Sequence, residues 1–523
     1  MAEDKSTTGV QEESLSSYGY KQEFKRVLKL RHLISYGLAY VTPTAPFPML
    51  GIVAIATAGH LATTYVVAFV ALFFTATSYA KMAYRHPIAG SAYSYSQRAI
   101  HPHVGFVIGW ALFMSYLLVP LLSVLAARDL CQQIIPSVPG WVWVWGFVLF
   151  MTLINFYGIR VTATANTVMN VAMILAAILF VVLGLVALSN GVGEGVILST
   201  KPFYEPGSFS STMILTGASI AVFSYIGFDG VSTLAEEVEN PRINIGRATI
   251  IVAVLCAVIF VVVAYISQLV WPNYGELPND VGAVLLISER MGGGIFRLFI
   301  FAIMIVAGVS CALASQTSAA RLMYGMGRDS VLPRKFFSYV SPTHQIPTYN
   351  LLLIAVVTLV CAFTFERFQT AAEVLNYGAF LGFFAVNLSV IFEYLINPII
   401  KKNEQGKELI EVLQAVRFPL AGILLCLIIF NFIEILTIKI LMIILTLIFS
   451  GRYLLSTNKF KNLEEYLWRY LLMPLLGMSV IGIIFYNLNR AVIKYVSYWM
   501  VGGLIYYGII TKGFRKTLKM KIE

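Results

Sequence analysis

Charged residues are scarce in this sequence. They occupy 12% of 523 positions, against about 25% in soluble domains, whereas hydrophobic residues reach 58%. A water-soluble chain of this length cannot hide so much apolar surface, so the sequence predicts a protein whose solvent is lipid. Apolar runs recur from residue 33 to residue 511 with only short polar gaps. This pattern favours one membrane domain over the three or four soluble domains that length alone suggests.

Cysteine and metal-binding patterns are also lacking. The cysteines stand singly, in or beside apolar runs, at Cys131, Cys256, Cys311, Cys361 and Cys426. An odd count without C-x-x-C argues against a disulfide framework and a metal site. His101 and His103 have no third ligand nearby in sequence, and residues 191–195 (GVGEG) lack the Lys-Ser/Thr of a phosphate loop. We therefore expect no metal, no cofactor and no enzymatic activity.

No cleavable signal peptide is recognisable. Residues 1–20 are polar, without an apolar core, so residues 1–27 are expected to be a disordered cytosolic tail. The net charge is +11, but Lys and Arg lie beside the apolar runs. The positive-inside rule and acidic lipid head groups explain that placement, so membrane lipids are the expected partners and nucleic acid is not.

What remains is a series of apolar runs, each near the roughly 20 residues that cross a bilayer. They cover 33–57, 62–83, 103–128, 140–158, 164–189, 212–237, 247–270, 296–321, 348–366, 372–395, 418–434, 438–455, 470–488 and 491–511. Lys and Arg cluster before the first run and after most even-numbered ones. The positive-inside rule then predicts a multi-pass plasma (inner) membrane protein with cytoplasmic N- and C-termini, the latter being the tail 512–523.

Two runs are interrupted by helix-breaking residues. Residues 41–48 (VTPTAPFP) place three prolines inside the first run, and residues 224–230 (SYIGFDG) place two glycines and Asp229 inside the sixth. Unwound backbone at membrane depth is tolerated only where protein buries it or where it lines a wet cavity. Interruptions at corresponding positions of two halves point to a midplane binding site between inverted repeats. The bland alternative is two kinked helices in an inert bundle.

Four segments together resemble the amino acid–polyamine–organocation (APC) superfamily. They are 227–242 (GFDGVSTLAEEVENPR), 86–95 (HPIAGSAYSY) with Pro102 and 109–110 (GW), 321–333 (RLMYGMGRDSVLP) and 347–350 (PTYN). The resemblance covers roughly residues 30–400. It implies an all-α polytopic membrane protein with a five-plus-five inverted-repeat, leucine-transporter-like core of ten helices over 28–397. A cytosolic linker at 398–416 and accessory transmembrane hairpins at 417–511 would follow.

Within the superfamily, the chain is most similar to the bacterial putrescine-importer branch. That branch has an acidic residue where this chain has Pro48, and another where it has Ser115, just before Tyr116. A dication needs carboxylates to replace its lost hydration. The two departures favour an amino acid over a polyamine as substrate. The branch ends after twelve spans, so one hairpin of the fourteen predicted spans is expected to be additional.

The resemblance also implies a substrate site at the two breaks. Free N–H groups of the first break would receive a carboxylate, since helix N-termini carry partial positive charge. Carbonyls of the second break would receive the amine, with Phe223, Tyr225 or Phe228 as an aromatic gate. The candidate substrate-binding residues are Thr42, Thr44, Ala45, Phe47, Gly51, Ser115, Tyr116, Phe223, Tyr225, Gly227, Phe228 and Asp229.

Asp229 is the clearest single candidate, because ionisable residues inside a membrane helix are functional by default. It would bind the amine, carry a proton or hold a basic partner. Glu236 and Glu237 lie two turns further on and would form a cytoplasmic gate with a basic side chain, or else a solvated helix end. The candidate partners are Arg85, Arg98, Arg242 and Arg321.

Coupling to protons is the expected energy source. Some relatives use a lysine of the fifth span, and residues 164–189 contain none. Ser310 and Ser315 are five positions apart and poorly aligned for sodium. The sequence therefore predicts a proton-coupled amino acid permease working by alternating access. A putrescine or polyamine importer, an exchanger and a transporter-derived sensor remain the alternatives.

Overall fold

The computed structural model describes residues 23–363, 368–397, 466, 468–486 and 492–513, and regular structure there is helical apart from an isolated bridge between Leu28 and Val238. Eight helices in this part of the chain are long and apolar enough to cross a membrane. The prediction of an all-α polytopic membrane protein is confirmed. The predicted linker at 398–416 and the predicted spans 418–434 and 438–455 lie outside the described residues.

Eight of the first ten predicted spans are present as helices without a long interruption. They are α3 (Leu61–Arg85), α5 (Pro102–Ile134), α6 (Gly140–Phe156), α7 (Ile159–Ser189), α9 (Pro241–Val270), α10 (Ala283–Arg328), α12 (Thr348–Ala362) and α13 (Phe368–Ile391), which continues into η6 (Phe392–Ile396). Three short helices lie in the connections: α4 (Ala92–Ala99), η5 (Tyr274–Glu276) and α11 (Arg334–Phe337). Helix α10 has non-helical backbone at Gly292 and Gly293, just before the predicted start at 296.

The first and sixth spans are each divided into three pieces. The first consists of α1 (Leu30–Val41), η2 (Phe47–Met49) and α2 (Leu50–Ala56). The sixth consists of α8 (Ser211–Ala221), η3 (Val222–Tyr225) and η4 (Phe228–Glu237). Each divided span is the first of five consecutive spans, as expected for the predicted five-plus-five arrangement.

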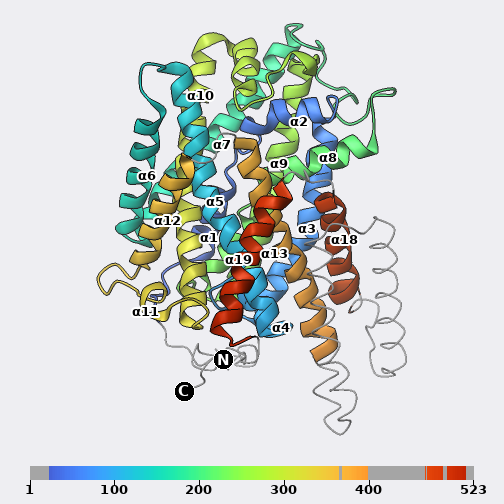
Figure 1. Cartoon of the computed structure of the whole chain (residues 1–523). Helices are drawn as coiled ribbons and strands as arrows, with labels where there is room; N and C mark the ends of the chain where they lie inside the picture. Colours follow the sequence, from blue (N-terminus) through green and yellow to red (C-terminus); the bar gives the residue numbers. More distant parts are fainter. Residues whose placement is uncertain (1–22, 364–367, 398–465, 467, 487–491, 514–523) are drawn as a thin grey trace, which may run out of the picture.

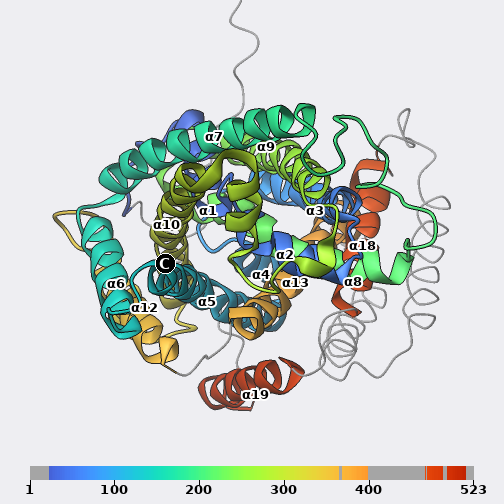
Figure 2. The same ribbon diagram turned by 90° about the horizontal axis from the view of Figure 1, so that it is seen from above.

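The divided first span lies inside the helical bundle. Seen from above, α1 and α2 are surrounded by α3, α5, α9, α10 and α13, with α6, α7 and α12 further out (Figure 2). Helix α1 packs against α7, α9 and α10, and α2 packs against α8. The unwound backbone is therefore enclosed by protein, as a bilayer requires.

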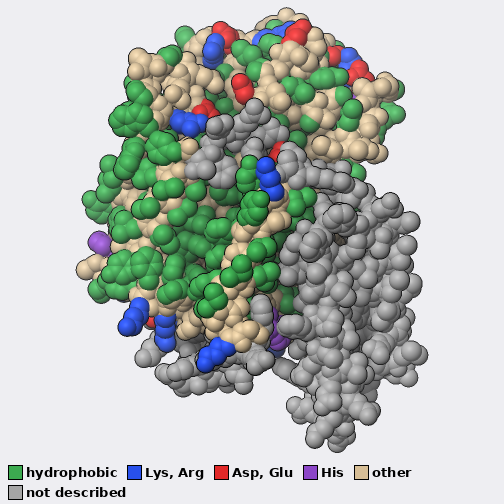
Figure 3. All heavy atoms as spheres, in the orientation of Figure 1, with side chains coloured by type: hydrophobic (Ala, Val, Ile, Leu, Met, Phe, Trp, Pro, Cys, Tyr) green, Lys and Arg blue, Asp and Glu red, His purple; other side chains and the backbone are tan. Residues whose placement is uncertain are grey.

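Two further helices from the end of the chain pack on different sides of this bundle (Figure 2). Helix α18 (Met473–Tyr486), preceded by η7 (Trp468–Leu472), packs on α3 and α13, and α19 (Ile493–Ile510) packs on α5 (Figure 1). On the face drawn in Figure 3, hydrophobic side chains cover most of the middle, and charged side chains gather toward the two ends. We call the end that holds residues 23–29 the N-terminal side.

Candidate functional site

The first break follows directly from its prolines. Helix α1 ends at Val41, and Thr42 adopts φ 60° and ψ 125°, outside the helical region. Turns then lead to the 3₁₀ helix η2, and regular α-helix resumes at Leu50. Pro43, Pro46 and Pro48 each lack the N–H that a continuous helix would need. The predicted interruption at 41–48 is present.

The second break is set by Gly227. Its φ of 126° is a conformation that side-chain-bearing residues rarely adopt, and a Cβ there would lie 2.7 Å from Cδ2 of Tyr40. Ile226 before it is extended, and η4 after it is a 3₁₀ helix of 10 residues. Such helices rarely exceed four residues, and a long one marks a hinge or strain.

The two breaks lie against each other. Ser224 Oγ donates a hydrogen bond to the carbonyl oxygen of Ala45 at 3.3 Å, which joins the second break to the first. The Tyr40 ring covers both Gly227 and Gly230. The Tyr40 carbonyl, released by the end of α1, accepts a hydrogen bond from Cys311 Sγ of α10 at 3.2 Å. Main chain that lost its helical partners is thus gathered in one place.

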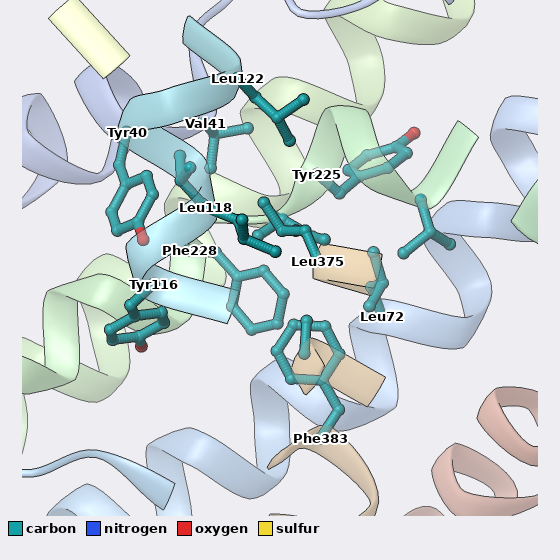
Figure 4. Packing of buried hydrophobic residues seen from close by; sticks show 14 of the residues in the cluster. Tyr40, Val41, Leu72, Tyr116, Leu118, Leu122, Tyr225, Phe228, Leu375 and Phe383 are labelled. Carbon is teal, nitrogen blue, oxygen red and sulfur yellow. The ribbon is translucent and has the colours of Figure 1, made fainter. Parts of the chain in front are cut away.

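Asp229 lies just beyond this junction and is 1% exposed. Its Oδ2 accepts a hydrogen bond from the Tyr116 hydroxyl of α5 at 2.6 Å. Among the described residues it has no ion-pair partner, in contrast to Glu236 and Glu237. The Tyr116 ring lies 6.2 Å from that of Tyr40, and the Tyr40 hydroxyl points toward the Tyr116 side chain (Figure 4). A buried carboxylate without an ion-pair partner is suited to holding a cation or a proton.

The three aromatic gate candidates have different surroundings. Phe228 is buried against Tyr79 and Phe383, with ring centroids 5.8 and 5.3 Å away (Figure 4). Tyr225 donates a hydrogen bond to the Tyr65 carbonyl at 3.0 Å and packs into the bundle. Only Phe223 of the three lines the cavity described below.

The remaining predicted residues are divided between the junction and its supports. Thr42, Thr44 and Ala45 form the first break itself, and Thr44 Oγ1 is buried without a hydrogen-bond partner in the described part. Ser115 Oγ instead donates to the Leu375 carbonyl of α13 at 3.1 Å.

Phe47 and Gly51 point away from the second break. The Phe47 ring packs 5.1 Å from Phe180 of α7. Gly51 lies against Pro278, whose carbonyl oxygen would be 2.3 Å from an added Cβ. These two residues support the junction from its far side.

A small, open cavity of about 20 Å³ adjoins the breaks beside α2 and α8, which lie toward the end of the molecule opposite the N-terminal side (Figure 1). It is lined by Met49, Ile52, Ile220, Phe223, Ala372, Glu373 and Asn376. Sequence reasoning missed the last two. The only signal in the sequence is that Glu373 is an acidic residue at the second position of the predicted span 372–395. A carboxylate at that place indicates the end of a span at the membrane interface.

On the N-terminal side, two ion pairs close the bundle. Glu237 pairs with Arg321, and both side chains are almost fully buried. Glu236 Oε1 accepts from Arg328 Nη1 at 2.7 Å and from the Ala89 amide at 3.0 Å. Of the predicted pairings, that with Arg321 is present, while Arg328 was not foreseen.

Arg85, another predicted gate residue, pairs with a carboxylate of a different element. Its Nε donates to Glu393 Oε1 at 2.8 Å, and that carboxylate also contacts His86. The pair joins α3 to η6, beside the closed end. It lies among the N-terminal-side contacts.

The residues before α1 seal this end further. The amides of Val27 and Leu28 donate to the Glu237 carbonyl at 2.9 and 3.0 Å. Phe24 is buried with its ring 5.0 Å from that of Tyr324. A segment of backbone thus covers the end of η4.

Comparison with known proteins gives one consistent family. Residues 32–490 match the family model described as amino acid permease. The chain is 32% identical over 495 residues to the low-affinity putrescine importer PlaP of Escherichia coli (strain K12), covering 94% of this chain and 95% of that protein. It is 27% identical over 403 residues to cationic amino acid transporter 3, mitochondrial, of Arabidopsis thaliana (73% and 64% covered). It is 25% identical over 399 residues to the branched-chain amino acid permease BcaP of Bacillus subtilis (71% and 81% covered).

Among solved structures, the chain is similar to Mhp1, a nucleobase-cation-symport-1 family transporter in a closed conformation. The TM-score is 0.49 at 15% sequence identity, with 92% of this chain and 97% of that chain covered.

Proposed function

The chain belongs to the amino acid permease family, within the APC superfamily, and on that premise we propose that it imports an amino acid by proton-coupled alternating access. The observation that carries this proposal is the junction of two broken helices beside the buried Asp229. The first break offers the Thr44 hydroxyl, which has no hydrogen-bond partner in the described part of the chain, to a carboxylate. The second break offers carbonyls, and Asp229 a negative charge, to an amine.

Alternating access needs a closed side and an accessible side. The N-terminal side is closed by the Glu237–Arg321 and Glu236–Arg328 pairs. The cavity at Phe223 lies on the other side of the breaks. We propose that the protein lies in a bacterial plasma membrane with its N-terminal side facing the cytoplasm, as the distribution of Lys and Arg predicts. The cavity is then the entry for external substrate.

Asp229 is the proposed proton carrier. It is buried and has no basic partner among the described residues, so its charge is costly unless a proton or an amine neutralises it. Protonation from outside, followed by release inside, would couple substrate movement to the proton gradient. Tyr116, which donates to the carboxylate, would hold it in position.

A second candidate substrate is putrescine. It is favoured by the similarity to the low-affinity putrescine importer PlaP over nearly the whole of both chains. Two residues argue against putrescine. Pro48 and Ser115 occupy positions where the bacterial putrescine-importer branch has acidic residues. We therefore propose an amino acid and not a diamine as the preferred substrate.

Uptake by the purified full chain in liposomes tests the proposal. Labelled amino acids and putrescine would be offered with and without an inward proton gradient. We expect saturable uptake of an amino acid that the gradient accelerates. Uptake of putrescine alone would contradict the amino acid preference. Absence of any saturable uptake or counterflow would contradict transport and favour a sensor.

A further inference from the structure

The segment before α1, residues 23–29, carries an aromatic side chain into the closed N-terminal side. We call this segment the strap. Its Phe24 is 3% exposed, although it lies outside every predicted span. The guanidinium carbon of Arg321 lies 5.8 Å from the centre of the Phe24 ring, and the Tyr324 ring meets that ring edge-on at 5.0 Å. Arg321 and Tyr324 are three positions apart on α10, so the strap packs on one face of that helix.

The Tyr324 ring extends this contact to the second ion pair. The guanidinium carbon of Arg328, the partner of Glu236, lies 5.4 Å from the centre of the Tyr324 ring. A guanidinium group beside an aromatic face is attracted to it, most strongly where water is excluded. Phe24 and Tyr324 together therefore contact the arginines of both ion pairs that close the N-terminal side.

The main chain of the strap is fixed to the end of η4. The amides of Val27 and Leu28 donate to the Glu237 carbonyl, and the amide of Glu239 donates to the Leu28 carbonyl at 2.9 Å. These bonds join the strap to the residues that carry the acidic partners of the two pairs. The Phe24 side chain, in contrast, contacts α10. If η4 and α10 separate, the strap stays with η4 and Phe24 has to leave α10.

We propose that Phe24 is a gate residue, which joins the two ion pairs into one latch on the N-terminal side. Its ring keeps water from Arg321, and an ion pair weakens when water enters because the effective dielectric constant rises. Loss of the ring should therefore favour the state that is open on this side. The inference rests on the proposed alternating-access function and adds a residue that controls it.

The test measures the closure of the N-terminal side directly. Thr233→Cys, at a side chain that is 1% exposed on η4, supplies a single cysteine in a background without others. A membrane-impermeant maleimide is applied to the N-terminal side of oriented vesicles that hold the full chain. We expect at least fivefold faster alkylation with Phe24→Ala and less than twofold change with Phe24→Tyr, which keeps the ring. Lys25→Ala, at the exposed neighbouring position, is the matched control and should also change the rate less than twofold.

A second reporter separates gate opening from loss of structure. Ser267→Cys is 1% exposed and lies near the far end of α9, whose first residue follows the gate. Its alkylation should stay slow in every variant. Faster alkylation at both reporters in Phe24→Ala would overturn the inference in favour of a structural role. Equal rates for Phe24→Ala and Lys25→Ala at Thr233→Cys would overturn it as well. These rates are measured without substrate, so failure of the unchanged chain to take up any amine would contradict the proposed function and not the closure by Phe24.

Discussion

Asp229 is the side chain to which we assign the proton and the amine in the proposed mechanism. A carboxylate at membrane depth costs at least about 2.5 kcal/mol even by the mildest measure. Here it receives one strong hydrogen bond, from Tyr116, and has no basic partner among the described residues. A residue of this kind persists only where the charge itself is used.

We expect Asp229→Asn to reduce proton-driven uptake at least 100-fold, since the amide neither carries a proton nor attracts an ammonium group. Asp229→Glu should retain measurable uptake with altered pH dependence. Initial rates in liposomes across external pH check both variants. Proton-driven uptake by Asp229→Asn at the unchanged rate would remove the residue from the mechanism.

Gly227 is the residue whose backbone makes the second break. Gly227→Ala would place a methyl group at φ 126° and against the Tyr40 ring, a strain of about 1–3 kcal/mol before the overlap is relieved. We expect a lower melting temperature in detergent and loss of uptake. Gly146→Ala in α6 is the matched control, because nothing lies within 4 Å of its added Cβ. Equal stability of the two variants would contradict this account.

The sequence identifies a candidate functional residue where the chemistry of a side chain does not suit its place in an apolar run. Asp229 stands out in the sequence because it is an acidic residue inside an apolar run. Gly227 stands out because it is a helix-breaking residue two positions before Asp229 in the same run. Tyr40 and Asn376 do not stand out. Their importance comes from packing across spans far apart in the chain, which hydropathy does not encode.

At the scale of elements, η4 is the piece that differs most from an ordinary helix. Its 3₁₀ geometry carries Asp229 near the start and Glu236 and Glu237 at the end. The glutamates are held by arginines of α10, which belongs to a different part of the bundle. In the proposed alternating-access cycle, opening of the N-terminal side would require these buried pairs to separate.

Glu237→Gln should therefore favour the state open on the N-terminal side, because it leaves Arg321 buried without its partner. The readout is alkylation of a single cysteine at Thr233, which is 1% exposed, in a background without other cysteines. We expect at least tenfold faster alkylation from the N-terminal side. Arg297→Gln, which breaks the exposed pair with Glu289, is the control. Equal alkylation rates for the two variants would argue against a gate.

Element breaks were predictable from proline and glycine inside apolar runs, and both were found. The length of the 3₁₀ segment was not predictable, since its sequence also suits an α-helix. The pairing of Glu236 with Arg328 was missed for a related reason. Arg328 ends a helix of 46 residues, and only the packing of α10 on η4 brings it to the gate.

On the scale of the whole molecule, the order of spans follows from hydropathy, but the placement of the last helices does not. Helix α19 is fixed to α5 by paired tryptophans. Trp110 Nε1 donates to the Trp499 carbonyl and Trp499 Nε1 to the Trp110 carbonyl, both at 2.9 Å, with rings 5.0 Å apart. One helical turn before Trp110 on α5, the Phe106 ring stacks on Tyr507 of α19, with the ring centroids 4.0 Å apart. Periodicity predicts an apolar helix at 491–511 without saying which helix it contacts.

These contacts determine a last prediction. Lipid is as apolar as a helix surface, so hydrophobic burial contributes little to holding α19 in place, and close packing and hydrogen bonds must do so. Trp499→Ala removes the stacked ring and its N–H donor, and leaves Trp110 Nε1 its carbonyl acceptor. We expect a loss of about 1–3 kcal/mol, seen as a lower melting temperature in detergent, with KM for the transported substrate unchanged. Tyr498→Ala, at a neighbouring side chain that is 75% exposed, should leave the melting temperature unaltered. A changed KM in Trp499→Ala would mean that α19 takes part in the transport cycle, because α5 carries Tyr116, the partner of Asp229.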